Sequence, residues 1–435
     1  MLGNCERALS GDAAIPTETT EKPAAGNRLL VTVADTGARP FQRGYHRAGY
    51  RVSSAALETM NNIERDYALT QIDSWPIPLL GVYCVVVAPA SSSNTQTTLT
   101  QLQRDVRVSL AQPMQTFTVQ ANATIQASEE KNNNEKNRSE KSYNDPYFSL
   151  QYGKYAPQIE QLHRRVTGRG VRVAIVDTGA DRTHPDLSGQ ISIARDFVAA
   201  SVDDIDKNSS VDKQFDNDIH GTAVAGIIVA SANNHVGIVG LAPAAEVLML
   251  KACWQLNADQ IAARCNSLTL AKALSFAIEQ RVDIVNLSLG GPTDPLLAQL
   301  LQVALGRGIL IVAAHDPHEP FPAGVPGVIA VNAASGPDFD TVARTIVVRS
   351  GNIDSDVARK DSAEPRLIVE AQASELLSTS PKGRYDYFSG SSMAAARVTG
   401  LSALMRQQQR SLSATQLLQN FNQWLSHSPA IAQLP

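Results

Sequence analysis

The sequence contains no run of about 18 consecutive apolar residues, so no segment is long enough to cross a bilayer as a helix. Its first 26 residues also lack the apolar core of a secretory signal peptide. We therefore expect a cytosolic protein, a signal already removed or a misassigned start, and composition does not decide among the three. Acidic and basic residues nearly balance, at a net charge of −4, which argues against a nucleic-acid or anionic-membrane partner.

Cysteine is also scarce, and four cysteines are too few for a disulfide-based scaffold. Cys84 follows an apolar run, which favours either a buried strand position or a free thiol. Cys253 and Cys265 bracket the short segment CWQLNADQIAARC and could close a loop as a disulfide. Two separate buried thiols explain the same pattern, and the spacing does not choose between these arrangements.

Apolar sequence, in contrast, is plentiful. The chain has 435 residues, of which 43% are hydrophobic, so it is long enough for two folded units and can bury a large core. Residues 1–26 are rich in Thr, Ala, Glu and Pro, and we interpret them as a flexible N-terminal tail. Residues 27–118 predict a first folded unit, and residues 146–435 predict a second.

The first unit combines strand and helix patterns. Residues 28–35 (RLLVTVAD) and 79–88 (LLGVYCVVVA) have the apolar, β-favouring composition of strands. A short helix pattern follows, with three apolar residues on one face: Leu99, Leu102 and Val106. Residues 107–119 predict a final strand with a break at Pro113. Strands and helices that alternate over such a short length predict a small α+β domain.

Residues 119–145 have a different character. They include the segment EEKNNNEKNRSEKS, which has almost no apolar residue and cannot bury enough surface to fold. We predict a disordered linker here, and an exposed polar linker is a natural site of proteolytic cleavage.

The second unit alternates strand patterns with helix patterns. Its strand patterns are nearly continuous apolar runs, as expected of strands covered on both faces: 171–177, 245–253, 282–291, 309–315 and 326–334. Its helix patterns include 220–230, 268–280 and 296–308, and Ser413 and Gln416 have capping-box spacing before a last helix. Strands separated by helices of this length predict a parallel sheet with helices on both faces.

Three segments of this unit place chemically useful residues at strand ends or helix starts. VAIVDTGADRTHPDL ends a strand at Asp177, DNDIHGTAVAG begins a helix near His220, and FSGSSMAAARVTG begins one near Ser392. A serine hydroxyl becomes a good nucleophile when a histidine takes its proton, and a buried carboxylate holds that histidine in the right tautomer. Each segment also has a structural explanation, as a turn aspartate, a helix-start histidine or a loop serine.

Together these three signatures resemble those of the subtilase family, in that family's chain order of Asp, His and Ser. The resemblance covers residues 146–410 and includes VGIVGLAPAAEVLMLKA and VDIVNLSLGG. It implies a subtilisin-like three-layer α/β fold with a central parallel sheet. It also implies a serine endopeptidase that hydrolyses polypeptides through an acyl-enzyme at Ser392, with His220 as base and Asp177 as orienting acid. No cofactor is then required for catalysis.

The same resemblance assigns further parts of the chain. Ser288, Leu289 and Gly290 would pair with the substrate backbone as an added strand. Residues 27–118 resemble the inhibitory propeptide of many subtilases, which would make this domain a partner of the peptidase and the chain a zymogen that cuts itself between Val119 and Asn144. An unrelated accessory domain is the alternative. We expect a secreted or periplasmic protein, and Cys253 and Cys265 to form a disulfide if it is exported.

A structural calcium ion is a further expectation of the family. The acidic stretch SVDDIDKNSSVDKQFDND could hold such an ion, but its composition favours a solvated loop.

Departures from the family pattern lead to a second hypothesis. The nucleophile segment reads GSSMAAAR (Gly390 to Arg397), where the family usually has Gly-Thr-Ser-Met-Ala-x-Pro-His. His315-Asp316 stands where subtilases place Gly-Asn, so Asp316 occupies the position of the side chain that donates to the oxyanion. A carboxylate cannot donate a hydrogen bond. A catalytically impaired subtilase fold, acting as a binding or scaffold protein, is therefore the alternative function.

Overall fold

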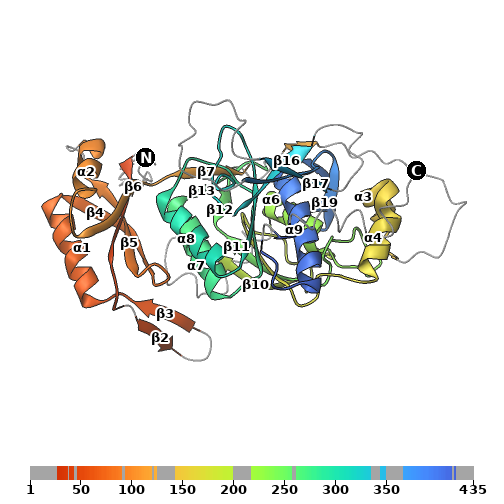
Figure 1. The fold of residues 1–435 in the computed structure, drawn as a ribbon, viewed down its shortest axis with the longest axis horizontal. Coiled ribbons are helices and arrows are strands. Elements are labelled where there is room, and N and C mark those ends of the chain that lie inside the picture. The colour runs from red at the N-terminus through yellow and green to blue at the C-terminus, as the bar shows by residue number, and fades with distance from the viewer. Residues whose placement is uncertain are drawn as a thin grey trace, which may run out of the picture.

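A computed structural model describes residues 27–37, 39–43, 47–90, 94–119, 122–124, 143–198, 217–256, 261–334, 343–348, 366–413 and 416–417. The predicted N-terminal tail, most of the predicted linker and nearly all of the acidic stretch lie outside these residues. Figure 1 shows two units joined by an extended segment, with the N-terminal unit at one end of the molecule.

The first unit is built on a four-stranded antiparallel sheet in the order β4-β5-β1-β6. Its strands are β1 (Leu29–Ala34), β4 (Leu69–Ile77), β5 (Val82–Pro89) and β6 (Val108–Pro113). The other elements are the hairpin of β2 (Arg39–Arg43) and β3 (Arg47–Arg51) and the helices α1 (Ser54–Asp66) and α2 (Thr95–Leu102).

The two faces of this sheet have different partners. Leu29 and Val31 pack with residues of α1 and α2. Leu30 and Cys84 alternate to the other face and join a cluster made mostly of the second unit, and Cys84 is a buried free thiol there. The helix prediction was wrong at Val106, which is fully exposed, because α2 ends at Leu102 and a turn follows.

The predicted final strand of this unit is two strands in different sheets. β6 ends at Pro113, whose ring nitrogen cannot donate to a ladder. The chain then leaves the first unit and forms β7 (Thr116–Val119), which pairs with β13 (Ala263–Asn266). Residues inside the predicted linker form β8 (Asn122–Thr124), which pairs with β20 (Arg384–Ser389). Both strands therefore lie against the second unit.

Among the described residues, the second unit holds an eight-stranded sheet in the order β10-β11-β9-β14-β15-β16-β18-β17. All of its strands run parallel except β17, which pairs antiparallel with β18 at the edge. Its strands are β9 (Arg172–Asp177), β10 (Ile191–Asp196), β11 (Glu246–Lys251), β14 (Ile284–Leu287), β15 (Leu310–Ala314), β16 (Ile329–Ala334), β17 (Ala343–Val348) and β18 (Arg366–Gln372). The remaining strands are β12 (Cys253–Gln255), beside β13, and β19 (Leu376–Ser380), beside β20.

Helices cover both faces of this sheet, as the alternation along β9 shows. Val173 and Ile175 pack in one cluster with α3 (Phe148–Tyr152), α4 (Ala156–His163), α6 (Ile219–Val229) and α9 (Ser391–Gln408). Ala174 and Val176 pack in another with α7 (Ser267–Glu279) and α8 (Pro295–Gly306). A 3₁₀ helix, η2 (Gly153–Tyr155), links α3 to α4. The predicted three-layer α/β fold is thus confirmed.

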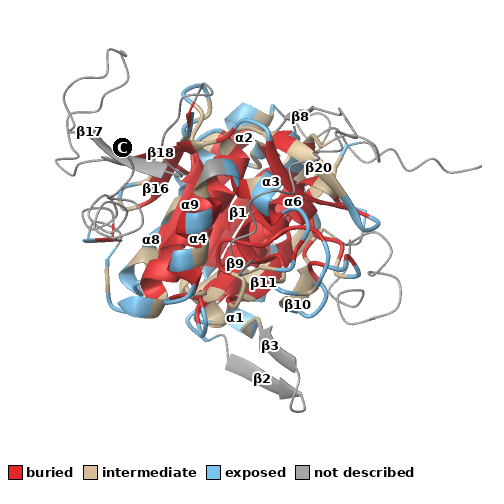
Figure 2. Cartoon of the chain, turned by 90° about the vertical axis from the view of Figure 1, so that its right-hand side faces the viewer, coloured by how far each residue is buried: buried red, intermediate tan, exposed pale blue. Residues whose placement is uncertain are grey.

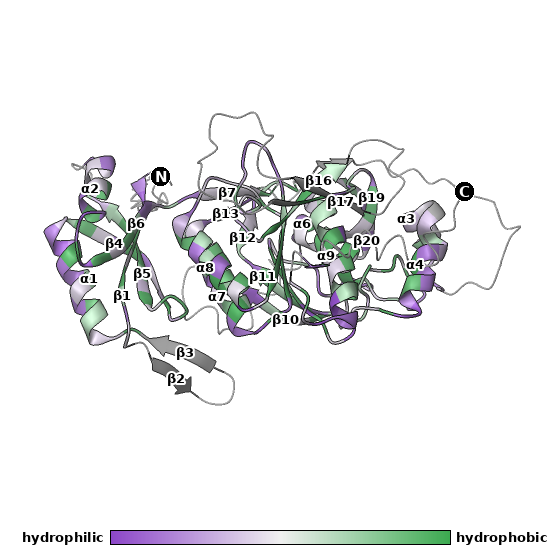
Figure 3. Ribbon diagram, viewed as in Figure 1, coloured by the Kyte–Doolittle hydropathy of each residue, from purple (hydrophilic) through white to green (hydrophobic). Residues whose placement is uncertain are grey.

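Burial and hydropathy follow this layering. The central strands and much of α9 are buried (Figure 2), and the same strands are strongly hydrophobic in Figure 3. In contrast, α7 and α8 carry both hydrophobic and hydrophilic residues (Figure 3). No helix among the described residues is long and apolar enough to cross a membrane.

Candidate active site

The carboxyl end of β9 brings an aspartate to a histidine. Asp177 is the last residue of this central strand, and His220 is the second residue of α6. His220 Nδ1 lies 2.8 Å from Asp177 Oδ1 and 2.9 Å from Oδ2, so it donates to the carboxylate. Thr178 N also donates to Asp177 Oδ1 at 2.7 Å. Both side chains are buried, at 1% and 0% exposure, which shields this charged hydrogen bond from water.

A glycine allows this approach of helix to strand. A Cβ atom on Gly221 would lie 2.0 Å from Gly179 O and 2.5 Å from Met249 Cε. Any side chain at this position would therefore push the start of α6 away from the turn that follows Asp177. The small residue after His220 is thus a requirement of packing.

Ser392 is the second residue of α9 and is fully buried. Gly390 precedes the helix at φ 127°, a conformation that disfavours residues with a side chain. Ser392 Oγ donates to Ser288 O at 3.0 Å, while His220 Nε2 is buried without a hydrogen-bond partner. Because α6 and α9 pack against each other, the two groups lie on neighbouring helices. A hydrogen bond between them would form only after the Ser392 hydroxyl turns from Ser288.

The segment that leaves the first unit crosses this region as an added strand. Thr118 and Gly290 exchange both backbone hydrogen bonds, with Thr118 N to Gly290 O at 2.8 Å and Gly290 N to Thr118 O at 2.9 Å. On its other side β7 pairs antiparallel with β13. Of the predicted substrate-pairing residues, Ser288 to Gly290, Gly290 thus pairs with a strand of this chain. Farther along, Asn122 of β8 stands opposite Ser389, three residues before Ser392.

Known proteins resemble this chain in sequence and in fold. The profile of the subtilase family matches residues 168–428. The chain belongs to the subtilase family. It is 33% identical over 258 residues to an intracellular serine protease of Paenibacillus polymyxa, covering 58% of this chain and 71% of that protein. It is 33% identical over 272 residues to thermitase of Thermoactinomyces vulgaris, covering 62% of this chain and 87% of thermitase.

One solved subtilase structure resembles almost the whole chain. Fervidolysin from Fervidobacterium pennivorans, a keratinolytic enzyme related to subtilisin, aligns with a TM-score of 0.59 at 19% sequence identity. The alignment covers 91% of this chain and 56% of fervidolysin. At this identity the likeness shows the fold alone.

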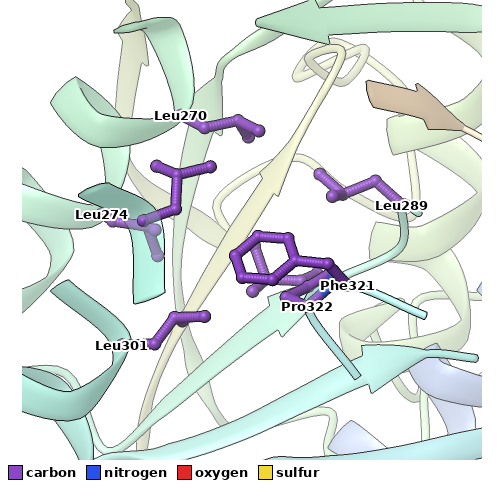
Figure 4. Close-up of a pocket in the computed structure, with 8 residues that line it drawn as sticks. Leu270, Leu274, Leu289, Leu301, Phe321 and Pro322 are labelled. Carbon is purple, nitrogen blue, oxygen red and sulfur yellow. The ribbon is translucent and has the colours of Figure 1, made fainter. Parts of the chain in front are cut away.

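An apolar cavity lies beside β7 in this subtilase. Phe117 of β7 is fully buried, and its ring centroid lies 5.8 Å from that of Phe321. A Cβ atom on Gly291 would lie 2.3 Å from the Phe117 ring, so a glycine makes room for it. Phe321 also lines a cavity formed by apolar residues only (Figure 4): Leu270, Leu274, Leu287, Leu289, Leu297, Leu301, Phe321 and Pro322.

A disulfide joins β12 to β13, the strand that pairs with β7. Cys253 of β12 and Cys265 of β13 are joined, so of the two arrangements left open by the sequence the disulfide is the one observed. Cys265 stands opposite Phe117 in the register of β13 with β7. The strand that pairs with β7 is therefore covalently tied to its neighbour.

Asp316 makes a hydrogen bond within its own loop. Its Oδ1 accepts a hydrogen bond from His318 N at 2.7 Å, within its own loop. The neighbouring His315 Nδ1 lies 2.7 Å from Asn332 Oδ1. Asp316 is thus bonded to its own loop, and His315 is bonded to β16.

A buried ion pair beside His220 was not foreseen from the sequence. Asp218, directly before α6, accepts a hydrogen bond from Lys251 Nζ, which also donates to Thr178 O. Burial raises the pKa of Asp218 to about 7, although the Lys251 ammonium acts to lower it. The only local signal was a lysine at the end of an otherwise apolar strand.

No group of three or more His, Cys, Asp or Glu side chains that could hold a metal ion occurs within the described ranges. The acidic stretch considered for calcium lies almost entirely outside them.

Proposed function

We propose that this subtilase is a serine endopeptidase in which Ser392 is the nucleophile, His220 the general base and Asp177 the group that orients His220. The observation that carries the proposal is the buried hydrogen bond from His220 Nδ1 to both Asp177 oxygens. It leaves Nε2, on the opposite side of the ring, as the nitrogen that takes a proton. Because Nε2 is buried and has no partner, it is free to accept a hydrogen bond from a serine hydroxyl.

Peptide hydrolysis follows from these groups in two steps. First, Ser392 Oγ bonds to the scissile carbonyl carbon while its proton passes to His220 Nε2. The C–N bond then breaks as His220 gives this proton to the departing amine. Second, water adds to the acyl carbon and gives a proton to His220, and the ester bond breaks as that proton returns to Ser392 Oγ. Asp177 stabilises the imidazolium formed in each step.

We further propose that residues 27–118 are an inhibitory domain and that the chain cuts itself. The domain contacts α7 and α8 through polar as well as apolar groups. Lys272 Nζ lies 3.0 Å from Asp73 Oδ2 and 5.3 Å from the centroid of the Trp75 ring. Gln112 Oε1 accepts from Leu296 N, in the first turn of α8, at 3.1 Å. Such contacts would hold β7 against Gly290 and β13.

The strand register suggests which bond is cut. Thr118 stands opposite Gly290. In an antiparallel pair each step forward on one strand is a step back on the other, so a substrate that keeps this register would bring the second residue after the one opposite Gly290 to Ser288. Ser288 O is the group that accepts from Ser392 Oγ. We therefore propose cleavage between Gln120 and Ala121, which lie outside the described residues.

Two further assignments remain proposals. A secreted or periplasmic location is supported by the Cys253–Cys265 disulfide, since disulfides persist in oxidising compartments. Two matched relatives, from Paenibacillus polymyxa and Bacillus subtilis, are intracellular serine proteases, so family membership alone does not favour export. A structural calcium ion would require ligands from the acidic stretch or elsewhere, and calcium addition with a thermal-unfolding readout tests it.

The alternative function, a catalytically impaired binding or scaffold protein, is favoured by one observation, the carboxylate at position 316. A fluorophosphonate probe separates the two functions, because it labels only an activated serine. We expect labelling of the processed wild-type protein and none of Ser392→Ala or His220→Ala. Labelling that persists in Ser392→Ala, or is absent from all three proteins, would exclude the proposed enzyme.

A further inference from the structure

Besides its backbone pairing, β7 makes one side-chain contact with a charged group of the second unit. Thr118 Oγ1 donates to Glu319 Oε2 at 2.7 Å. Glu319 lies in the loop that follows β15, far from Thr118 in sequence. On the proposed function, Thr118 is the third residue before the scissile bond, so Glu319 contacts a substrate position.

This position is not recognised by a pocket. Phe117 and Val119 are buried, at 0% and 5% exposure, because their side chains point into the second unit. Thr118 lies between them on the opposite side of the strand and is only partly buried. On this side of the strand, Arg264 of β13 stands opposite Thr118 and is exposed, and Glu319 donates no proton but accepts from the Thr118 hydroxyl. The Glu319 carboxylate is thus the group in hydrogen-bond contact with the side chain at position 118, and Arg264 is the charged group across the strand pair.

The backbone partner of Thr118 is a glycine, which lets the carboxylate reach across the edge strand. A Cβ atom on Gly290 would lie 3.2 Å from Glu319 O and 3.5 Å from Glu319 Oε2. The glutamate thus packs directly on the Gly290 backbone. Its carboxylate is held beside the main-chain hydrogen bonds that seat the substrate strand.

We propose that Glu319 is a specificity-determining residue that selects hydrogen-bond donors and cations at the third residue before the scissile bond. A carboxylate accepts from a Thr or Ser hydroxyl, pairs with a Lys or Arg side chain, and repels Asp or Glu. Valine matches threonine in shape but lacks the donor. We expect kcat/KM to favour Thr over Val by about threefold and Lys over Glu by about tenfold, as expected for partly exposed contacts.

The first experiment measures kcat/KM of the processed protein on peptides spanning residues 115–124, with Thr, Val, Lys or Glu at position 118. In Glu319→Gln the preference for Lys over Glu should fall to about one or below, because Arg264 still stands opposite position 118, and in Glu319→Lys it should invert. Glu160→Gln, on α4 and remote from β7, is the matched control and should keep the wild-type order. Hydrolysis of all four peptides with an order that ignores Glu319 overturns this inference and leaves the peptidase intact. Hydrolysis of none of them overturns the proposed function instead.

A second experiment needs no catalysis. In full-length Ser392→Ala, hydrogen exchange of the amides of β7 reports how firmly the strand is seated. Thr118→Glu should speed exchange over residues 116–119, because two carboxylates then face each other. Adding Glu319→Lys should slow it again, whereas adding Glu160→Lys should not. Equal exchange in Thr118→Glu with and without Glu319→Lys would overturn the inference, whatever the enzyme assays show.

Discussion

Lys251 Nζ donates to Asp218 Oδ2 in the buried space between the strand that ends at Asp177 and the helix that carries His220. Lys251 stands opposite Asp177 in the register of β11 with β9, and it also donates to the backbone of the next residue, Thr178 O. The side chains of Lys251 and Asp218 are 4% and 5% exposed. This pair therefore ties the two elements that bring Asp177 and His220 together.

At pH 8, above the pKa of about 7 that burial gives Asp218, Asp218→Asn leaves the Lys251 ammonium buried without its counter-charge. We expect the free energy of unfolding to fall by about 3–5 kcal/mol, measured by urea denaturation in a Ser392→Ala background that prevents self-digestion. The acid limb of the kcat/KM profile should move to lower pH, because the unbalanced ammonium opposes a second positive charge on His220. Asp218→Asn with Lys251→Met should recover most of the stability. No loss in the single variant would show that the pair does not tie these elements.

His163 should make stability depend on pH. Burial lowers its pKa to about 4, and its ring is satisfied in the neutral form, since Nε2 donates to Leu241 O and Nδ1 accepts from Tyr143 OH. Between pH 6.5 and 4 the unfolded chain takes up a proton that the folded chain does not. Stability present above pH 6.5 is therefore lost as the pH falls, by up to about 3 kcal/mol.

The measurement compares urea midpoints at pH 7 and pH 5 for Ser392→Ala with and without His163→Gln. The glutamine variant should lose part of the pH dependence, because it has no proton to gain. An identical pH dependence in both proteins would show that the pKa of His163 is the same in the folded and the unfolded chain.

Asp316 should limit turnover. Its carboxylate accepts from His318 N and offers no proton to an oxyanion, so we expect a slow enzyme whose rate does not follow the titration of this group. Asp316→Asn keeps an acceptor and adds a donor, and kcat should rise at every pH, by up to about 10²-fold. If wild-type activity instead falls as pH rises and the asparagine variant removes that fall, a protonated Asp316 is the donor. Lower turnover of the variant at every pH would contradict both accounts.

The central sheet could be predicted, and the candidate site residues could be proposed, because their signals are local. Asp177 ends an apolar strand, and His220 and Ser392 each stand one residue inside a helix, so the surrounding sequence marks all three. The end of α2 at Leu102 was missed because the helical spacing of apolar residues in the sequence continues to Val106. The helix ends at the turn that leads into β6.

Contacts between distant segments carried no such signal. Lys251 contacts Asp218, and Glu319 contacts Thr118, across long stretches of sequence. The residues next to each of these four give no indication of which residue it contacts. The strand β8 was likewise hidden, because three residues without apolar alternation become a strand only when β20 offers them hydrogen bonds. Pairing of this kind is a property of the fold rather than of the segment.

The most direct test of the central claim compares wild type with Ser392→Ala, both made by cell-free translation without other proteases. Intact mass and N-terminal sequencing of each protein report whether the chain has cut itself. We predict that the wild type divides between Gln120 and Ala121, leaving a new terminus at Ala121, and that Ser392→Ala stays whole. An uncut wild type, or the same cut in Ser392→Ala, would contradict the account.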